Sequence, residues 1–190
     1  MALRLDRINV LVVEDLKPMR DLIVGALEAF GIGHIVTAND GESGFTQFIK
    51  HTPDIVITDW MMEPVDGLEL IQRIRKSPMS INRLVPIILI TGYSAMSRVT
   101  RARDLGVTEF LTKPFTADDL AKRITHIINK PRDFVEAPNF FGPDRRRRKP
   151  DDYAGPRRRE AEGAPTQTAA EQRRAARPPS KNWEIDKDNE

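Results

Sequence analysis

The stretch that decides the fold spans residues 54–67 and reads DIVITDWMMEPVDG. It opens with a short run at 55–58, apolar but for its last residue, which is typical of a strand buried on both faces of a parallel sheet. The run stops at one carboxylate, Asp59, and loop and turn residues follow, among them Pro64 and Gly67. Because open α/β sheets bind ligands at the carboxyl edge of their strands, the sequence predicts that Asp59 is the chemical centre of the protein.

Short apolar runs alternate with amphipathic segments on both sides of this stretch. We expect strands at 8–13, 34–38, 55–58, 85–90 and 109–112, and helices at 18–30, 41–51, 68–76, 94–105 and 117–129. Gly31 and Gly106 end two of the helices, and Thr116 caps the last one. Five strand–helix units with short connections predict right-handed crossovers and one parallel sheet covered by helices on both faces.

Polar side chains follow four of the predicted strands. They are Glu14 and Asp15 after the first strand, Asp59 at the end of the third, Thr91 after the fourth and Lys113 after the fifth. In a parallel sheet these ends meet at one edge, where the carboxylates repel one another and a hard cation such as Mg²⁺ relieves the repulsion. A transferred phosphoryl group also requires a hydroxyl and an ammonium, which Thr91 and Lys113 supply.

This constellation resembles the receiver domain of two-component response regulators, of the chemotaxis-regulator type, over residues 7–130. The motifs that carry the resemblance are the Glu14-Asp15 pair, Asp59 with Met61-Met62 and Gly67, Thr91-Gly92, and Phe110 three residues before Lys113-Pro114. The resemblance implies an α/β fold of the flavodoxin-like (βα)5 type, with a five-stranded parallel sheet in the order 2-1-3-4-5. It also implies a signalling switch that acts through protein–protein contacts, without an attached DNA-binding output domain.

The resemblance further implies a separate role for each carboxylate. Asp59 would be the phospho-acceptor. Asp15 and Asp59 would bind Mg²⁺ directly, together with the backbone carbonyl of Met61, and Glu14 would act through water. One departure from the family pattern is visible, since Pro64 stands one place later than usual.

The remaining residues of the motif would form the switch. Thr91 and Lys113 would contact the phosphoryl oxygens, Thr91 and Phe110 would be the switch pair, and the Lys113–Pro114 peptide bond would be cis. A histidine kinase or phosphotransfer protein would donate the phosphoryl group, and the protein would catalyse only its own transfer and dephosphorylation. The signal would leave through the helix at 94–105, the strand at 109–112 and the last helix, toward a downstream protein or a second copy of the chain.

The composition limits the classes of protein that remain. The chain has 190 residues, enough for one domain and a sizeable tail, and its hydrophobic fraction of 39% is low for a chain folded throughout. It contains no cysteine, which excludes disulfides, thiolate zinc sites and a cysteine nucleophile. Neither a signal-peptide pattern nor an apolar run long enough to span a membrane is present, so we expect a cytoplasmic protein.

Residues 131–190 have a different character and are predicted to be a mostly disordered, Pro- and Arg-rich tail. They carry 14 Lys and Arg against 12 Asp and Glu, with basic runs at 145–149 and 157–159. Such a segment has too few large apolar residues to offset its ordering entropy. Four apolar residues, at 134, 135, 140 and 141, lie close enough to the last helix to fold back onto the domain.

Two other functions are compatible with parts of the sequence. The basic tail fits an adaptor that binds nucleic acid or another acidic surface, although it lacks a fold that reads bases. A hydrolase on a similar α/β sheet would need a mobile cap, for which the short loops leave no room. His34, His51 and His126 have no acidic or serine partners at useful spacing, so we expect solvent or packing roles for them.

Overall fold

The computed structural model describes residues 5–92, 100, 102–137 and 140–144. Its main sheet is parallel and has the order β2-β1-β3-β4-β5, as the sequence predicted. The strands are β1 (Asn9–Val13), β2 (His34–Ala38), β3 (Ile55–Asp59), β4 (Ile87–Thr91) and β5 (Glu109–Thr112). The helices are α1 (Lys17–Ala29), α2 (Gly41–His51), α3 (Gly67–Lys76) and α5 (Ala117–Asn129), after a 3₁₀ turn at Leu5–Arg7.

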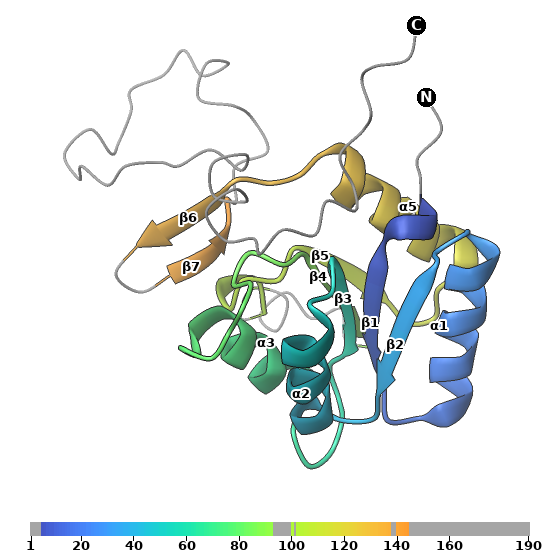
Figure 1. Ribbon diagram of the computed structural model, residues 1–190, viewed down its shortest axis with the longest axis horizontal. Coiled ribbons are helices and arrows are strands. Elements are labelled where there is room, and N and C mark those ends of the chain that lie inside the picture. Colours follow the sequence, from blue (N-terminus) through green and yellow to red (C-terminus); the bar gives the residue numbers. More distant parts are fainter. Residues whose placement is uncertain (1–4, 93–99, 101, 138–139, 145–190) are drawn as a thin grey trace, which may run out of the picture.

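Helices cover both faces of the sheet (Figure 1). Alternation along the strands divides the core into two layers, one on each face. On one face, Leu11, Val13 and Leu89 pack against α2 and α3. On the other face, Val10 and Val12 pack against α1 and α5. Because successive side chains of a strand point to opposite faces, strands that are apolar throughout fill both layers at once.

Local sequence signals fix the starts of two helices. Asp40 begins α2 with a capping box, in which its carboxylate accepts from the amides of Glu42 and Ser43. Thr116 begins α5 in the same way, together with Asp119. Of the predicted helix at 94–105, the described residues 100 and 102–104 are helical, and the rest of that prediction lies outside the described residues apart from Leu105, which is in the following turn.

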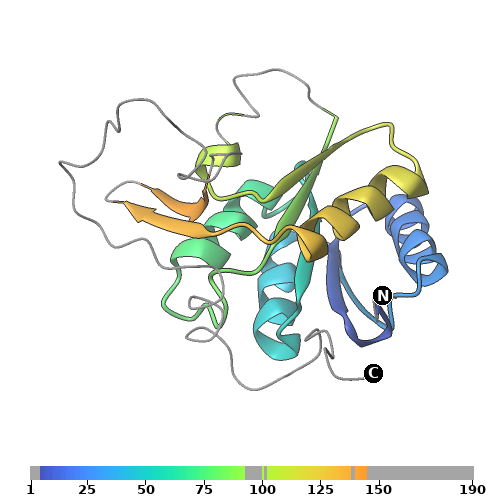
Figure 2. The ribbon, with the colours of Figure 1, turned by 90° about the horizontal axis from the view of Figure 1, so that it is seen from above.

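The structure corrects the predicted tail boundary, because the chain continues past α5 as a β-hairpin. Strands β6 (Phe134–Ala137) and β7 (Phe140–Pro143) pair antiparallel beside α3 (Figures 1 and 2). Phe134 is only 6% exposed, so this segment is part of the folded domain. The hairpin itself was not predicted, because the residues that stabilise it lie far away in the sequence. The expectation that apolar residues of this segment fold back onto the domain agrees with the burial of Phe134. The remainder of the predicted tail, at 145–190, lies outside the described residues.

The helices within the described part of the chain are all too short or too polar to cross a membrane.

Candidate functional site

The predicted site residues do converge on the carboxyl edge of the sheet. Asp59 is the last residue of β3, and its register partner in β4 is Ile90, which places Thr91 one residue further along. Lys113 directly follows β5, and its amide donates to the carbonyl of Thr91 over 2.8 Å. Glu14 directly follows β1, which is paired with β3. Topology alone therefore brings four separate strand ends together.

The centre of the site is an ammonium held between two buried carboxylates. The Nζ of Lys113 lies 2.9 Å from Oδ1 of Asp59 and 3.2 Å from Oε2 of Glu14. The side chains of Glu14 and Asp59 are 0% and 8% exposed. Water therefore screens these charges weakly, and each group depends on the others for compensation.

Burial and the neighbouring charges shift the pKa values of Glu14 and Lys113. Burial raises the pKa of Glu14 above its usual value, and the charge of Asp59 raises it further, while Lys113 only partly offsets both. Burial would lower the pKa of Lys113, but its hydrogen bond to Asp59 and the charges of both carboxylates outweigh burial and raise it. The site thus holds more negative charge than one ammonium neutralises.

A third carboxylate completes an arrangement suited to a metal ion. Glu14, Asp15 and Asp59 each offer a ligand atom, and the three atoms lie within 4.8 Å of one another. Asp15 is exposed, so the cluster is open to solvent on one side. Carboxylate oxygens with room for several waters are the surroundings that Mg²⁺ prefers, and the residual negative charge favours a cation. The donor set therefore fits Mg²⁺.

Backbone contacts hold Asp59 in place from the side of α3. The amide of Gly67 donates to the carbonyl of Trp60 over 2.9 Å. A Cβ at Gly67 would overlap the carbonyl oxygen of Asp59, so a larger residue would push α3 away from the site. The hydroxyl of Thr58 donates to the same Asp59 carbonyl over 2.9 Å. The loop after β3 is thus tied to the first turn of α3.

The remaining predicted residues have distinct surroundings. Thr91 is 1% exposed, and Phe110 is partly buried against the core cluster that contains Trp60. The side chain of Met61 is 57% exposed, whereas Met62 is buried, so only Met62 anchors the loop. The Lys113–Pro114 bond is cis, as the resemblance implied, and so is the Glu63–Pro64 bond at the position that departs from the family pattern.

Sequence reasoning missed one basic residue beside the site. The Nη1 of Arg20 donates to the backbone carbonyl of Glu14 over 2.7 Å and so supports the turn between β1 and α1. The signal was its position in the first turns of the helix that follows the acidic pair.

The fold and the site define a flavodoxin-like α/β domain with a cluster of carboxylates at the carboxyl edge of its sheet. The family model of the response regulator receiver domain matches residues 10–125, and the chain belongs to this family. Receiver domains interact with histidine kinases or phosphotransfer proteins in two-component signalling, and they bind Mg²⁺ through such an acidic site.

Individual relatives agree with this assignment. The phosphate regulon transcriptional regulatory protein PhoB of Escherichia coli (strain K12) is 29% identical over 122 residues, which cover 64% of this chain and 52% of PhoB. Chemotaxis protein CheY-3 of Vibrio cholerae is 28% identical over 122 residues, which cover 64% of this chain and 92% of CheY-3. The chain thus matches only about half the length of PhoB, and nearly all of CheY-3.

Solved structures give the same result. The chemotaxis response regulator CheY4 of Vibrio cholerae superimposes with a TM-score of 0.58 at 25% identity and covers 63% of this chain and 98% of its own. The receiver domain of the Francisella response regulator 1452 gives a TM-score of 0.57 at 28% identity, covering 62% of this chain and 93% of its own. In each case the shared part is the receiver fold.

Proposed function

We propose that the protein is a phosphorylation-controlled switch, in which a carboxylate oxygen of Asp59 accepts a phosphoryl group from a phosphohistidine of a kinase or phosphotransfer protein. The new bond is an acyl phosphate, the bond to the histidine nitrogen breaks, and water later hydrolyses the acyl phosphate. The observation that carries the proposal is the Lys113 ammonium, 2.9 Å from Asp59 in a cluster of three carboxylates.

Each neighbouring group has a proposed task in the transfer. Mg²⁺, held by Asp15, Asp59 and the Met61 carbonyl with Glu14 acting through water, would neutralise charge that develops on the phosphoryl oxygens. Lys113 already contacts Asp59, and its ammonium would move with little rearrangement to an oxygen of the attached phosphoryl group. The hydroxyl of Thr91 would donate to another. The chemistry is confined to the protein's own aspartate, so we do not expect turnover of a separate substrate.

The output of the switch is proposed to be a protein–protein contact. Strand β5 and helix α5, with the helix that contains residues 100 and 102–104, would present the signal once Thr91 and Phe110 rearrange. A second copy of the chain is one candidate partner on this face. A direct role of the Arg-rich segment at 145–149 in binding nucleic acid or another polyanion is the second candidate output, and strong salt-dependent binding by that segment would favour it.

Labelling with radioactive acetyl phosphate and Mg²⁺ tests the acceptor. We expect the unmodified chain to be labelled and Asp59→Asn to remain unlabelled. Asp54→Asn is the matched control, because Asp54 lies at the opposite end of β3, where its carboxylate accepts from the amide of Asn9 over 3.0 Å. Undiminished labelling of the Asp59 variant would show that the acceptor is another residue.

A further inference from the structure

The hairpin is held against the receiver by two stacked cations. The guanidinium of Arg75 lies 5.1 Å from the ring centre of Phe134, and that of Arg83 lies 4.0 Å from the ring centre of Phe141. Phe134 and Phe141 lie on the same face of the hairpin, because Phe141 pairs with Glu136, two residues after Phe134. One face of the hairpin is thus fitted to the end of α3 and the loop that follows it.

Residues just before and just after the hairpin make polar contacts. The Nη2 of Arg132, just before the hairpin, lies 3.5 Å from Oε1 of Glu109 at the start of β5. The amide of Asp144, just after the hairpin, donates to the carbonyl of Asp133 over 2.6 Å. The first contact ties the segment to the receiver, and the second closes the hairpin on itself.

Arg75 also connects the hairpin to the segment that precedes β5. It is 1% exposed, and its Nε and Nη2 donate to the carbonyl of Gly106 over 3.1 and 2.9 Å. Gly106 lies in the turn after the helical residues 102–104. A Cβ at Gly142 would come within 2.8 Å of the Gly106 Cα, so the hairpin backbone packs directly on this turn. A shift of that turn must therefore disturb both Arg75 and the hairpin.

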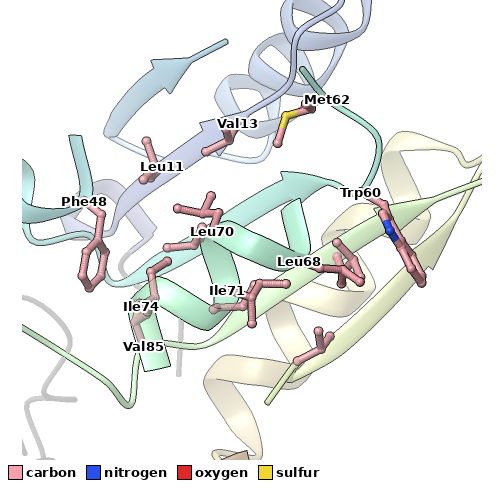
Figure 3. Packing of buried hydrophobic residues seen from close by; sticks show 14 of the residues in the cluster. Leu11, Val13, Phe48, Trp60, Met62, Leu68, Leu70, Ile71, Ile74 and Val85 are labelled. Carbon is pink, nitrogen blue, oxygen red and sulfur yellow. The ribbon is translucent and has the colours of Figure 1, made fainter. Parts of the chain in front are cut away.

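Helix α3 extends from the phosphorylation site to the hairpin. Its first residue, Gly67, packs on the carbonyl of Asp59, and Arg75 lies in its last turn. Between these ends, Leu68 and Ile71 pack in the same cluster as Trp60, the residue after Asp59 (Figure 3). Ala102, from the helical residues that precede the Gly106 turn, belongs to this cluster as well. Packed interiors respond to strain as connected units, so both ends of α3 are mechanically linked.

We propose that the β6–β7 hairpin is a regulatory strap that stabilises the receiver conformation in which Lys113 bridges Asp59 and Glu14. This inference rests on the proposed function of Asp59. The strap docks on the arrangement of α3 and Gly106 that accompanies this bridge. A phosphoryl group on Asp59 takes Lys113 as its own partner and so favours a different arrangement. Phosphorylation and docking of the strap then oppose each other, and the opposition is reciprocal.

A titration with beryllofluoride, an analogue of the phosphoryl group, tests the strap in the full chain. Trp60 directly follows Asp59, so we expect its fluorescence to change on binding, and Trp183→Phe removes the second tryptophan. Phe134→Leu removes the ring from Arg75. We expect this variant to be half-saturated at a beryllofluoride concentration about fivefold lower than the parent requires, which is the lower end of the usual coupling between sites. Met79→Leu, at an exposed position in the loop after α3, is the control and should match the parent.

A second measurement needs no substitution in the hairpin. Beryllofluoride should speed hydrogen exchange at the Asp144 amide and across 134–143 in the unmodified chain, because it loosens the strap. Equal half-saturation in a folded Phe134→Leu protein, or unchanged exchange, overturns the strap. Should Phe134→Leu fail to fold, the exchange measurement decides. If no protein binds beryllofluoride, the proposed function itself fails, and the strap fails with it.

Discussion

The two ends of α3 each meet a buried charge, and the two charges are stabilised in different ways. At the carboxyl edge, Asp59 is compensated by the opposite charge of Lys113. At the other end, Arg75 is compensated without an ion pair among the described residues: three of its N–H groups donate to the carbonyls of Gly106 and Arg83, and its guanidinium stacks on Phe134. Burial, and to a lesser extent the charge of Arg83, lowers the pKa of Arg75 to about 9, so it remains a cation near neutral pH.

This difference separates a site whose contacts an incoming ligand can replace directly from a site whose contacts are all made to the protein's own backbone and rings. The ammonium of Lys113 contacts Asp59 and Glu14 in a cluster with surplus negative charge, so an incoming cation or phosphoryl group can replace part of its contacts. The donors of Arg75 are directed at fixed backbone carbonyls, and its flat face is covered by a ring. An uncompensated buried charge costs several kcal/mol, so these contacts are structural requirements. The first end therefore has the composition expected of a ligand site. The second is a structural contact, which we call the Arg75–Phe134 contact.

The largest expected effect comes from removing the Arg75–Phe134 contact. Truncation after Lys130 removes the ring over Arg75 and exposes that guanidinium, and we expect a loss of about 3 kcal/mol in the free energy of unfolding. Truncation after Asp144 keeps the hairpin and its closing hydrogen bond, so we expect a change below about 1 kcal/mol. Urea unfolding of both proteins measures the difference. Equal midpoints for the two truncations would mean that the hairpin contributes nothing to stability.

The next effect concerns the ligand site. Mg²⁺ that binds only the folded state should raise the melting temperature with concentration, by a stabilisation of about 1.4 kcal/mol at ten times the dissociation constant. Asp15→Asn should show a weaker dependence, yet the metal-free variant should be no less stable than the parent, because one repelling charge is gone. Glu136→Gln is a matched control, since it removes a carboxylate near Arg83 at the other end of α3. A melting curve that Mg²⁺ does not move would contradict a metal site.

The two ends of α3 also differ in how far their contacts could be predicted from the sequence. The site was predictable because parallel topology brings strand ends together, so Asp59 and Lys113 meet although they lie 54 positions apart in the chain. The capping residue Thr116 was predictable because capping is local. The Arg75–Phe134 contact was not predictable. Stacking of Arg75 on Phe134 leaves no periodic pattern in the sequence, and it connects the end of a helix to a short strand flanked by prolines. Arg75 reads in the sequence as one more basic residue in a last helical turn.

The smallest expected effect concerns Asp119, a carboxylate at the start of α5 that belongs to neither buried charge. Its Oδ2 accepts from the hydroxyl of Thr116 over 2.8 Å and from the Thr116 amide over 3.1 Å. These hydrogen bonds lower the pKa of Asp119 below its usual value. A carboxyl group whose pKa falls on folding stabilises the protein above its unfolded pKa, and this contribution disappears as the pH falls through the folded value.

Asp119→Ala should therefore lower the urea midpoint near neutral pH, and its difference from the parent should shrink as the pH falls below about 4, the ordinary range of an aspartate. Asp118→Ala is the control on the same turn, because Asp118 pairs with exposed Lys122 over 2.6 Å and takes no part in the cap. An Asp119 difference that stays constant into acid would assign its effect to helix propensity alone. A difference that closes with falling pH would show that an exposed charge at this edge acts locally, through its own cap, in contrast to the coupled charges around Asp59.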